Sequence, residues 1–134
     1  MREDIEIRVA KLTFAFMFGA GVYSIIEILY RGYTHPSMTI TGGICCVAVY
    51  CFAISKIGYL KSAVLSAVLI TLSELCVGLL VNRILGLNVW DYSHHKFNIM
   101  GQICPLFSAI WLILSMISIP LCRYMDKKLF FYNF

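Results

Sequence analysis

Residues 62–82 read SAVLSAVLITLSELCVGLLVN, a run in which Glu74 is the one charged residue. A helix of this length extends about 30 Å, which matches the roughly 30 Å hydrocarbon core of a bilayer. A strand of a membrane barrel would instead alternate apolar and polar residues over about ten positions. The run therefore predicts a helix that crosses a membrane.

Three more apolar runs flank this one. Of the 134 residues, 60% are hydrophobic and 13% are charged, whereas soluble domains carry about 25% charged residues. A soluble protein this short could not bury so much apolar surface. We predict an all-α fold class, an integral membrane four-helix bundle that forms a single domain over residues 1–134. The helices are expected at about 11–31, 38–56, 61–83 and 99–124.

Pro105 leaves two possible starts for the fourth helix. Proline is typical of the first helical turn, so this helix could begin near Cys104 rather than at residue 99. Residues 97–104 would then be an ordered segment that enters the outer leaflet. Such backbone is tolerated only where protein buries it or where it lines water.

Lysine and arginine residues predict the orientation. With the N-terminus in the cytoplasm, the inner segments hold Arg2, Arg8, Lys11, Lys56, Lys61, Arg123, Lys127 and Lys128, and the outer segments hold Arg31, Arg83 and Lys96. Because cytoplasmic loops are enriched in basic residues, we expect an N-in, C-in protein with an ordered outer loop between helices 3 and 4. The first run ends in Tyr30 and Arg31 rather than in a cleavage site, so we expect it to remain as a helix.

Small residues recur where helices would pack. Those at four-residue spacing, or paired, are Ala15, Gly19, Gly42, Gly43, Ala63, Ala67 and Thr71. Small side chains let helix backbones approach closely in lipid. The cysteines lie in or beside apolar runs without a CxxC spacing: Cys45, Cys46, Cys51, Cys76, Cys104 and Cys122. We expect them to serve as apolar residues in helix contacts, not as disulfides or zinc ligands.

The unusual polar residues gather in the outer half of the oriented chain. Candidates for a substrate or ion pathway are Glu27, Glu74, Asn82, Asp91, Asn98 and Gln102. A carboxylate inside a membrane helix costs at least a few kcal/mol, so Glu74 should face the bundle interior or a wet cavity. The alternative for Glu74 is a hydrogen-bond network that only joins helices. The alternative for Glu27 is snorkelling or pairing with Arg31, four residues on.

The polar stretch LNVWDYSHHKFN, residues 87–98, forms the predicted outer loop. Its aromatic residues suit the membrane interface, and Asp91 with Ser93 predicts a turn or a helix cap. His94 and His95 could bind a metal with nearby carboxylates. Adjacent side chains of an extended segment point to opposite sides, however, so we expect two exposed histidines, no metal and no cofactor.

The block VNRILGLNVWDYSHHKFNIMGQICPLFSAIW, residues 81–111, resembles the signature of the CmpB-like family of bacterial type IV ABC-transporter permeases. Matching positions are Glu27, Glu74, Asn82, Trp90, Asp91, Tyr92, Ser93, Phe97, Asn98, Gly101, Ile103, Cys104, Ser108 and Trp111. Trp90, Tyr92, Ser93, Phe97, Gly101 and Trp111 are the structural motif among them. The resemblance spans roughly residues 18–125 and implies a multi-pass protein of a bacterial plasma membrane.

The chain departs from that family's pattern at one position and in one turn. Many members carry Arg where this chain has Gln102, so a pairing of that Arg with Glu74 would be absent here. The turn after the first helix is reduced to residues 33–37 in place of a Gly-Pro-rich turn. No P-loop GxxxxGK[ST] occurs, so ATP hydrolysis would need a separate ATPase subunit.

Three functions remain open at this point. The first is a transport or permease component, which with so few helices would need a homo-oligomer or a partner. The second is a membrane-embedded enzyme acting on a lipid-linked or extracytoplasmic substrate, with Glu74, Glu27, Asp91 and His94 as acid/base groups. The third is an assembly or scaffold subunit. The lipid bilayer is an expected partner in every case, and nucleic acid is not, because no nucleic-acid motif accompanies the net charge of +4.

Overall fold

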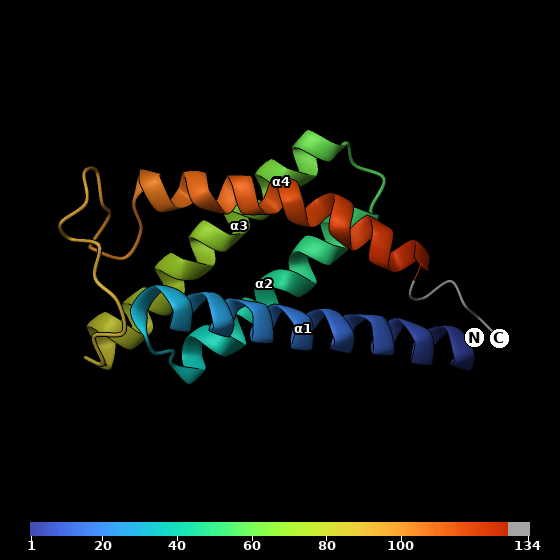
Figure 1. Ribbon diagram of the computed structural model, residues 1–134, viewed down its shortest axis with the longest axis horizontal. Helices are drawn as coiled ribbons and strands as arrows, with labels where there is room; N and C mark the ends of the chain where they lie inside the picture. The colour runs from blue at the N-terminus through green and yellow to red at the C-terminus, as the bar shows by residue number, and fades with distance from the viewer. Residues whose placement is uncertain (129–134) are drawn as a thin grey trace.

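Four long helices make up the computed structural model, which describes residues 1–128 (Figure 1). They are α1 (Arg2–Arg31), α2 (Pro36–Ile54), α3 (Tyr59–Gly78) and α4 (Pro105–Lys128). The π-helical segment η1 (Leu79–Ile84) continues α3 without a break. Each of the four helices, with η1 counted as part of α3, is long and apolar enough to cross a membrane. The predicted all-α membrane bundle is therefore confirmed.

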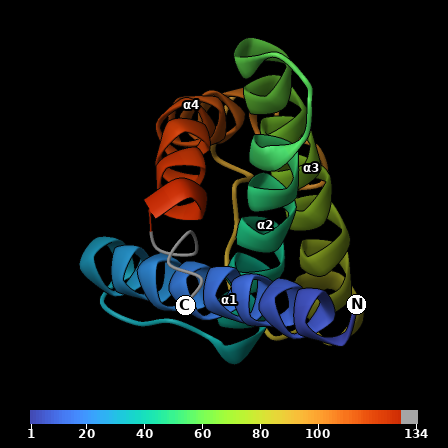
Figure 2. The same ribbon diagram turned by 90° about the vertical axis from the view of Figure 1, so that its right-hand side faces the viewer.

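The helices run alternately in opposite directions between two ends of the molecule. The α1–α2 turn and the segment 85–104 lie at one end, and the α2–α3 turn lies at the other with the start of α1 and the end of α4 (Figure 1). Helix α2 is central, since it packs against α1, α3 and α4, and α3 also packs against α4. Figure 2 shows α1 crossing α2 steeply.

Glycines make the crossing of α1 and α2 close. A Cβ atom built on Gly42 would lie 2.6 Å from the Cβ of Tyr23, and one built on Gly19 would lie 2.8 Å from the carbonyl oxygen of Gly42. A side chain on Gly43 would overlap the ring of Phe16. Backbone approach of this kind replaces the hydrophobic effect in lipid, as the small-residue spacing predicted.

The buried side chains form two groups. One lies where all four helices meet and comprises Ala15, Val49, Tyr50, Ala53, Ala63, Ile119 and Cys122. The other joins the start of α2 to η1 and to the segment 85–104, and comprises Met38, Val81, Val89, Trp90, Tyr92 and Cys104. The non-helical segment is thus packed into protein, which is the condition for placing irregular backbone near a membrane.

Two helix starts differ from the prediction. Helix α1 begins at Arg2 rather than near residue 11, because Glu3 and Asp4 suit a helix N-terminus and Arg2 pairs with Glu6 at 3.3 Å. The fourth helix begins at Pro105, so the start at residue 99 was wrong and the alternative was right. Phe97, Met100 and Gly101 all have positive φ, which interrupts any helix before Pro105.

Candidate functional site

From its place in η1, Asn82 organises residues 85–104, which we call the outer segment after the predicted orientation. Its Oδ1 accepts a hydrogen bond from the backbone N–H of Val89 at 2.6 Å, and its Nδ2 donates to Oε1 of Gln102 at 2.7 Å. The wider π-helical turn ends α3 and precedes this irregular segment. Asn82 therefore fastens the beginning and the end of the segment to the same helix.

Gln102 adds hydrogen bonds within the outer segment. Its Nε2 donates to the carbonyl of Met100 at 2.9 Å, and its own carbonyl accepts from Nε1 of Trp90 at 3.0 Å. A Cβ on Gly78 would lie 2.5 Å from Oε1 of Gln102, so this glycine makes the space that the amide occupies. Gln102 is buried and its polar atoms are all used within the segment and η1.

Asn98 and Asp91 shape the exposed part of the segment. Asn98 donates to the carbonyl of His95 at 2.9 Å and accepts from the N–H of Gly101 at 3.0 Å. Asp91 accepts from the N–H of Ser93 at 2.9 Å, and this bond holds the pKa of the exposed Asp91 carboxyl below its usual value. The turn predicted from Asp91 and Ser93 is present.

Glu27 forms the expected pair with Arg31. The two side chains approach to 3.4 Å in a largely buried place, and Nη1 of Arg31 donates to the carbonyl of Val89 at 2.9 Å. This chain of contacts ties the end of α1 to the outer segment. Glu27 is thus matched by a positive charge within its own helix.

Glu74 has a different environment. It is 3% exposed, and its Oε2 accepts from Nε1 of Trp111 at 3.0 Å while its Oε1 accepts from the hydroxyl of Tyr92 at 3.3 Å. Burial raises the pKa of Tyr92, so this phenol keeps its proton and donates. In the described part of the chain, Glu74 forms no ion pair.

Aromatic rings hold the two donors to Glu74 in place. The ring of Tyr92 stacks on Phe107 of α4 with centroids 4.5 Å apart, and His95 packs edge-on against both. Trp111 stacks with Tyr23 of α1 at 5.9 Å. The carboxylate is therefore positioned by the outer segment, α1 and α4 together, although it belongs to α3.

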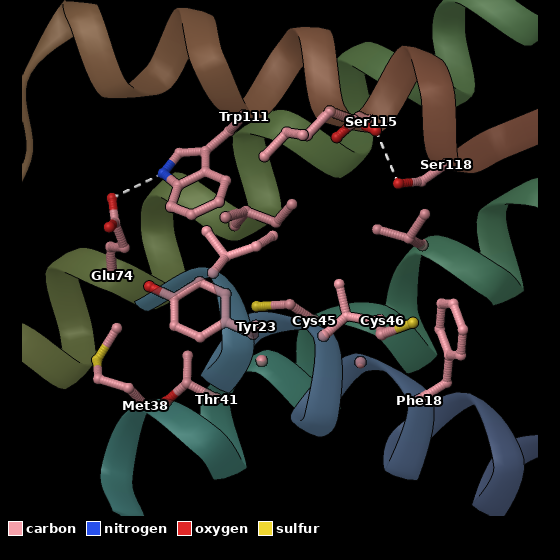
Figure 3. A pocket seen from close by; sticks show the side chains of 17 residues that line it. Phe18, Tyr23, Met38, Thr41, Cys45, Cys46, Glu74, Trp111, Ser115 and Ser118 are labelled. Carbon is pink, nitrogen blue, oxygen red and sulfur yellow. Dashed lines mark hydrogen bonds between the residues drawn. The ribbon is translucent and has the colours of Figure 1, made fainter. Parts of the chain in front are cut away.

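A cavity of about 160 Å³ opens beside Glu74, between α1, α2 and α4. Most of its wall is apolar side chains. In Figure 3, Glu74 and Trp111 lie at one end of the cavity, and Phe18 and Cys46 lie at the other. Among the described residues that line it, Glu74 is the one carboxylate.

Ser115 is a lining residue that sequence reasoning missed. It is 1% exposed, and its hydroxyl has no hydrogen-bond partner in the described part of the chain. Membrane serines usually bond the carbonyl four residues earlier, as Ser118 does to Leu114 at 2.7 Å. Nothing in the spacing of the sequence distinguishes Ser115 from Ser118, because the difference arises from tertiary packing.

The six predicted pathway residues therefore separate into two sets. One set forms hydrogen bonds that hold the outer segment in shape, and it comprises Asn82, Asp91, Asn98 and Gln102. Glu27 instead pairs with Arg31. Only Glu74 of this group lines the cavity. Within residues 1–128, no three His, Cys, Asp or Glu side chains lie close enough together to hold a metal ion.

Comparison with known proteins gives one match. The family described as "Putative ABC-transporter type IV" matches residues 8–132 of the chain. No curated protein and no solved structure matches it.

Proposed function

This chain belongs to the family described as "Putative ABC-transporter type IV", and we propose that it is a membrane-embedded transport component whose cargo occupies the cavity beside Glu74. The observation that carries the proposal is the position of Glu74. A buried carboxylate in a membrane helix is expensive and is commonly functional. Here it faces a cavity, and its direct partners within residues 1–128 are two neutral donors.

The location of the cavity suits a transport path. It lies between α1 and α4, which pack against α2 but make few contacts with each other. Side chains bridge these two helices at both ends of the molecule: Tyr30 meets Phe107 at 6.5 Å, and Lys11 pairs with Asp126 at 3.0 Å. Widening this space requires α1 and α4 to separate and the stack of Tyr23 on Trp111 to open, but it does not require α2 to leave α3.

Energy would come from a separate ATPase subunit, because the chain has no P-loop. The α2–α3 turn is the surface that we propose for this contact. Arg123 donates to the carbonyls of Ala53 at 2.8 Å and Ile57 at 3.3 Å, which couples that turn to α4. In the predicted N-in, C-in orientation this turn lies in the cytoplasm with the exposed Lys56, and the exposed Lys61 lies next to it in the first turn of α3. A homo-oligomer would supply the further helices that a transport path needs.

Flux through proteoliposomes tests the proposal. The chain is reconstituted with the ATPase that copurifies from native membranes, a mixture of small molecules is added, and ATP-dependent accumulation is measured by mass spectrometry. Glu74→Gln should abolish accumulation, whereas Asp91→Asn, a matched change at an exposed carboxylate, should leave it intact. Accumulation that survives in Glu74→Gln would remove Glu74 and its cavity from the mechanism.

A further inference from the structure

The wall of the cavity defines the chemistry of a ligand. Its lining is mostly apolar. Polar residues reach it from all four helices, and two of them are Glu74 on α3 and Ser115 on α4, whose hydroxyl has no hydrogen-bond partner within residues 1–128. A cavity of roughly 150 Å³ with an apolar lining holds one benzene molecule. At about 160 Å³, this cavity has room for one aryl group or a short alkyl chain.

Within residues 1–128, the carboxyl group of Glu74 makes no direct ion pair. Both of its direct hydrogen bonds come from neutral donors, Trp111 and Tyr92. Arg31, whose charge acts on Glu74 through space, makes its direct contacts with Glu27 and with the carbonyl of Val89. A buried carboxylate without a countercharge is costly, and a cation brought by a ligand would remove that cost. Ser115 would accept or donate one further hydrogen bond.

The cavity also has an apolar rim. Phe18, Val22 and Ile26 of α1 line it and remain 40%, 39% and 44% exposed, on a helix that spans the membrane. These exposed faces of a spanning helix meet lipid rather than water. A molecule that partitions into the bilayer can therefore reach the cavity from its side.

From these three observations we propose that the cavity binds a lipophilic amine, with its apolar group among the lining side chains and its ammonium group against Glu74. This deepens the proposed function, on which it rests, by naming the cargo class. An amphiphile of this class concentrates in the membrane, so lateral entry between α1 and α4 fits its chemistry. Binding needs no ATPase, so it can be measured on this chain alone.

Three probes of similar size and different charge test the proposal. They are 2-phenylethylamine, 3-phenylpropan-1-ol and 3-phenylpropionate, titrated at pH 7 into the purified full-length chain in detergent micelles and followed by calorimetry. The amine should bind more tightly than the alcohol, and the carboxylate should not bind. Glu74→Gln should weaken the amine at least about tenfold and leave the alcohol unchanged, which also shows that the variant is folded.

Two further variants sharpen the test. Glu74→Asp keeps the charge and should keep the preference for amine over alcohol. Glu6→Gln changes a carboxylate on the exposed start of α1 and should leave all three affinities unchanged. Equal binding of amine and alcohol by the wild type, or unchanged amine binding in Glu74→Gln, would overturn the proposal. The proposal would also be overturned if none of the three probes bound because a phospholipid, or a second copy of the chain, occupied the cavity.

The two proposals can fail separately. If flux depends on Glu74 but the amine does not bind, the cargo class is wrong and transport stands. If the amine binds with the expected dependence on Glu74 but nothing accumulates in proteoliposomes, the chain binds amines without transporting them.

Discussion

Glu74 stands apart from the other polar residues because of what surrounds it rather than because of its type. Glu27 is equally buried, yet it has a cation four residues away in its own helix. Asn82 and Gln102 are also polar residues close to Glu74 in the chain of contacts, but their side chains hydrogen-bond to each other and to the backbone of the outer segment. Glu74 alone among these groups combines burial, neutral partners and an adjoining cavity.

The substitution Ser115→Ala should make the protein more stable. A buried hydroxyl without a partner costs about 1–3 kcal/mol, so replacing it with a methyl group should stabilise the empty protein by about 1 kcal/mol. Ser66→Ala is the matched control, since Ser66 is also buried in a helix but donates to the carbonyl of Ser62 at 2.8 Å. It should give no such gain.

Thermal unfolding in detergent, followed by circular dichroism, measures both variants. We expect a higher Tm for Ser115→Ala than for the wild type or Ser66→Ala. A lower Tm for Ser115→Ala would mean that its hydroxyl has a stabilising partner, and the polar character assigned to that wall of the cavity would be lost.

The apolar runs of the sequence predicted the helices well, because the thickness of the hydrocarbon core sets the length of a spanning helix. The i, i+4 spacing likewise predicted the contact of Glu27 with Arg31. The outer segment was less predictable. Asn82 and Gln102 meet across twenty positions through backbone with positive φ at Phe97, Met100 and Gly101, and no periodic pattern encodes such a path.

The stability of the protein should depend on the close contact of α1 with α2. Gly42→Ala should destabilise the protein by about 1–3 kcal/mol, because its Cβ would lie 2.6 Å from that of Tyr23 in a crossing of two backbones. Gly21→Ala is the same chemical change on α1 at a position with nothing within 4 Å. Since alanine favours a helix over glycine, it should be neutral or stabilising by up to about 1 kcal/mol.

Tm values and the monodispersity of the purified variants compare the two changes. Equal Tm values for Gly42→Ala and Gly21→Ala would contradict the close crossing of α1 and α2. We expect a lower Tm for Gly42→Ala and no decrease in Tm for Gly21→Ala.

For the whole molecule, the orientation follows from charge and stays a prediction. The fold places the outer segment at one end and the α2–α3 turn at the other (Figure 1). Lys96 in the segment and Lys56 and Lys61 near the turn are all exposed, so each can react with an amine-directed reagent.

A membrane-impermeant amine-reactive reagent added to intact cells should therefore modify Lys96 and spare Lys56 and Lys61. Peptide mass spectrometry reads each site, and permeabilised cells supply the control in which all three react. Modification of Lys56 and Lys61 in intact cells, with Lys96 spared, would reverse the orientation and move the proposed ATPase contact to the wrong side.

In the proposed function, cargo occupies the cavity between α1, α2 and α4. ATP-dependent accumulation in proteoliposomes by Ser115→Leu tests this, because the leucine adds apolar bulk at a buried lining position and leaves Glu74 and the outer segment unchanged in sequence. Ile117→Phe adds bulk to the exposed face of the same helix and is the matched control. We expect Ser115→Leu to stop accumulation while Ile117→Phe transports normally. Normal accumulation by a folded Ser115→Leu protein would show that cargo does not pass through this cavity.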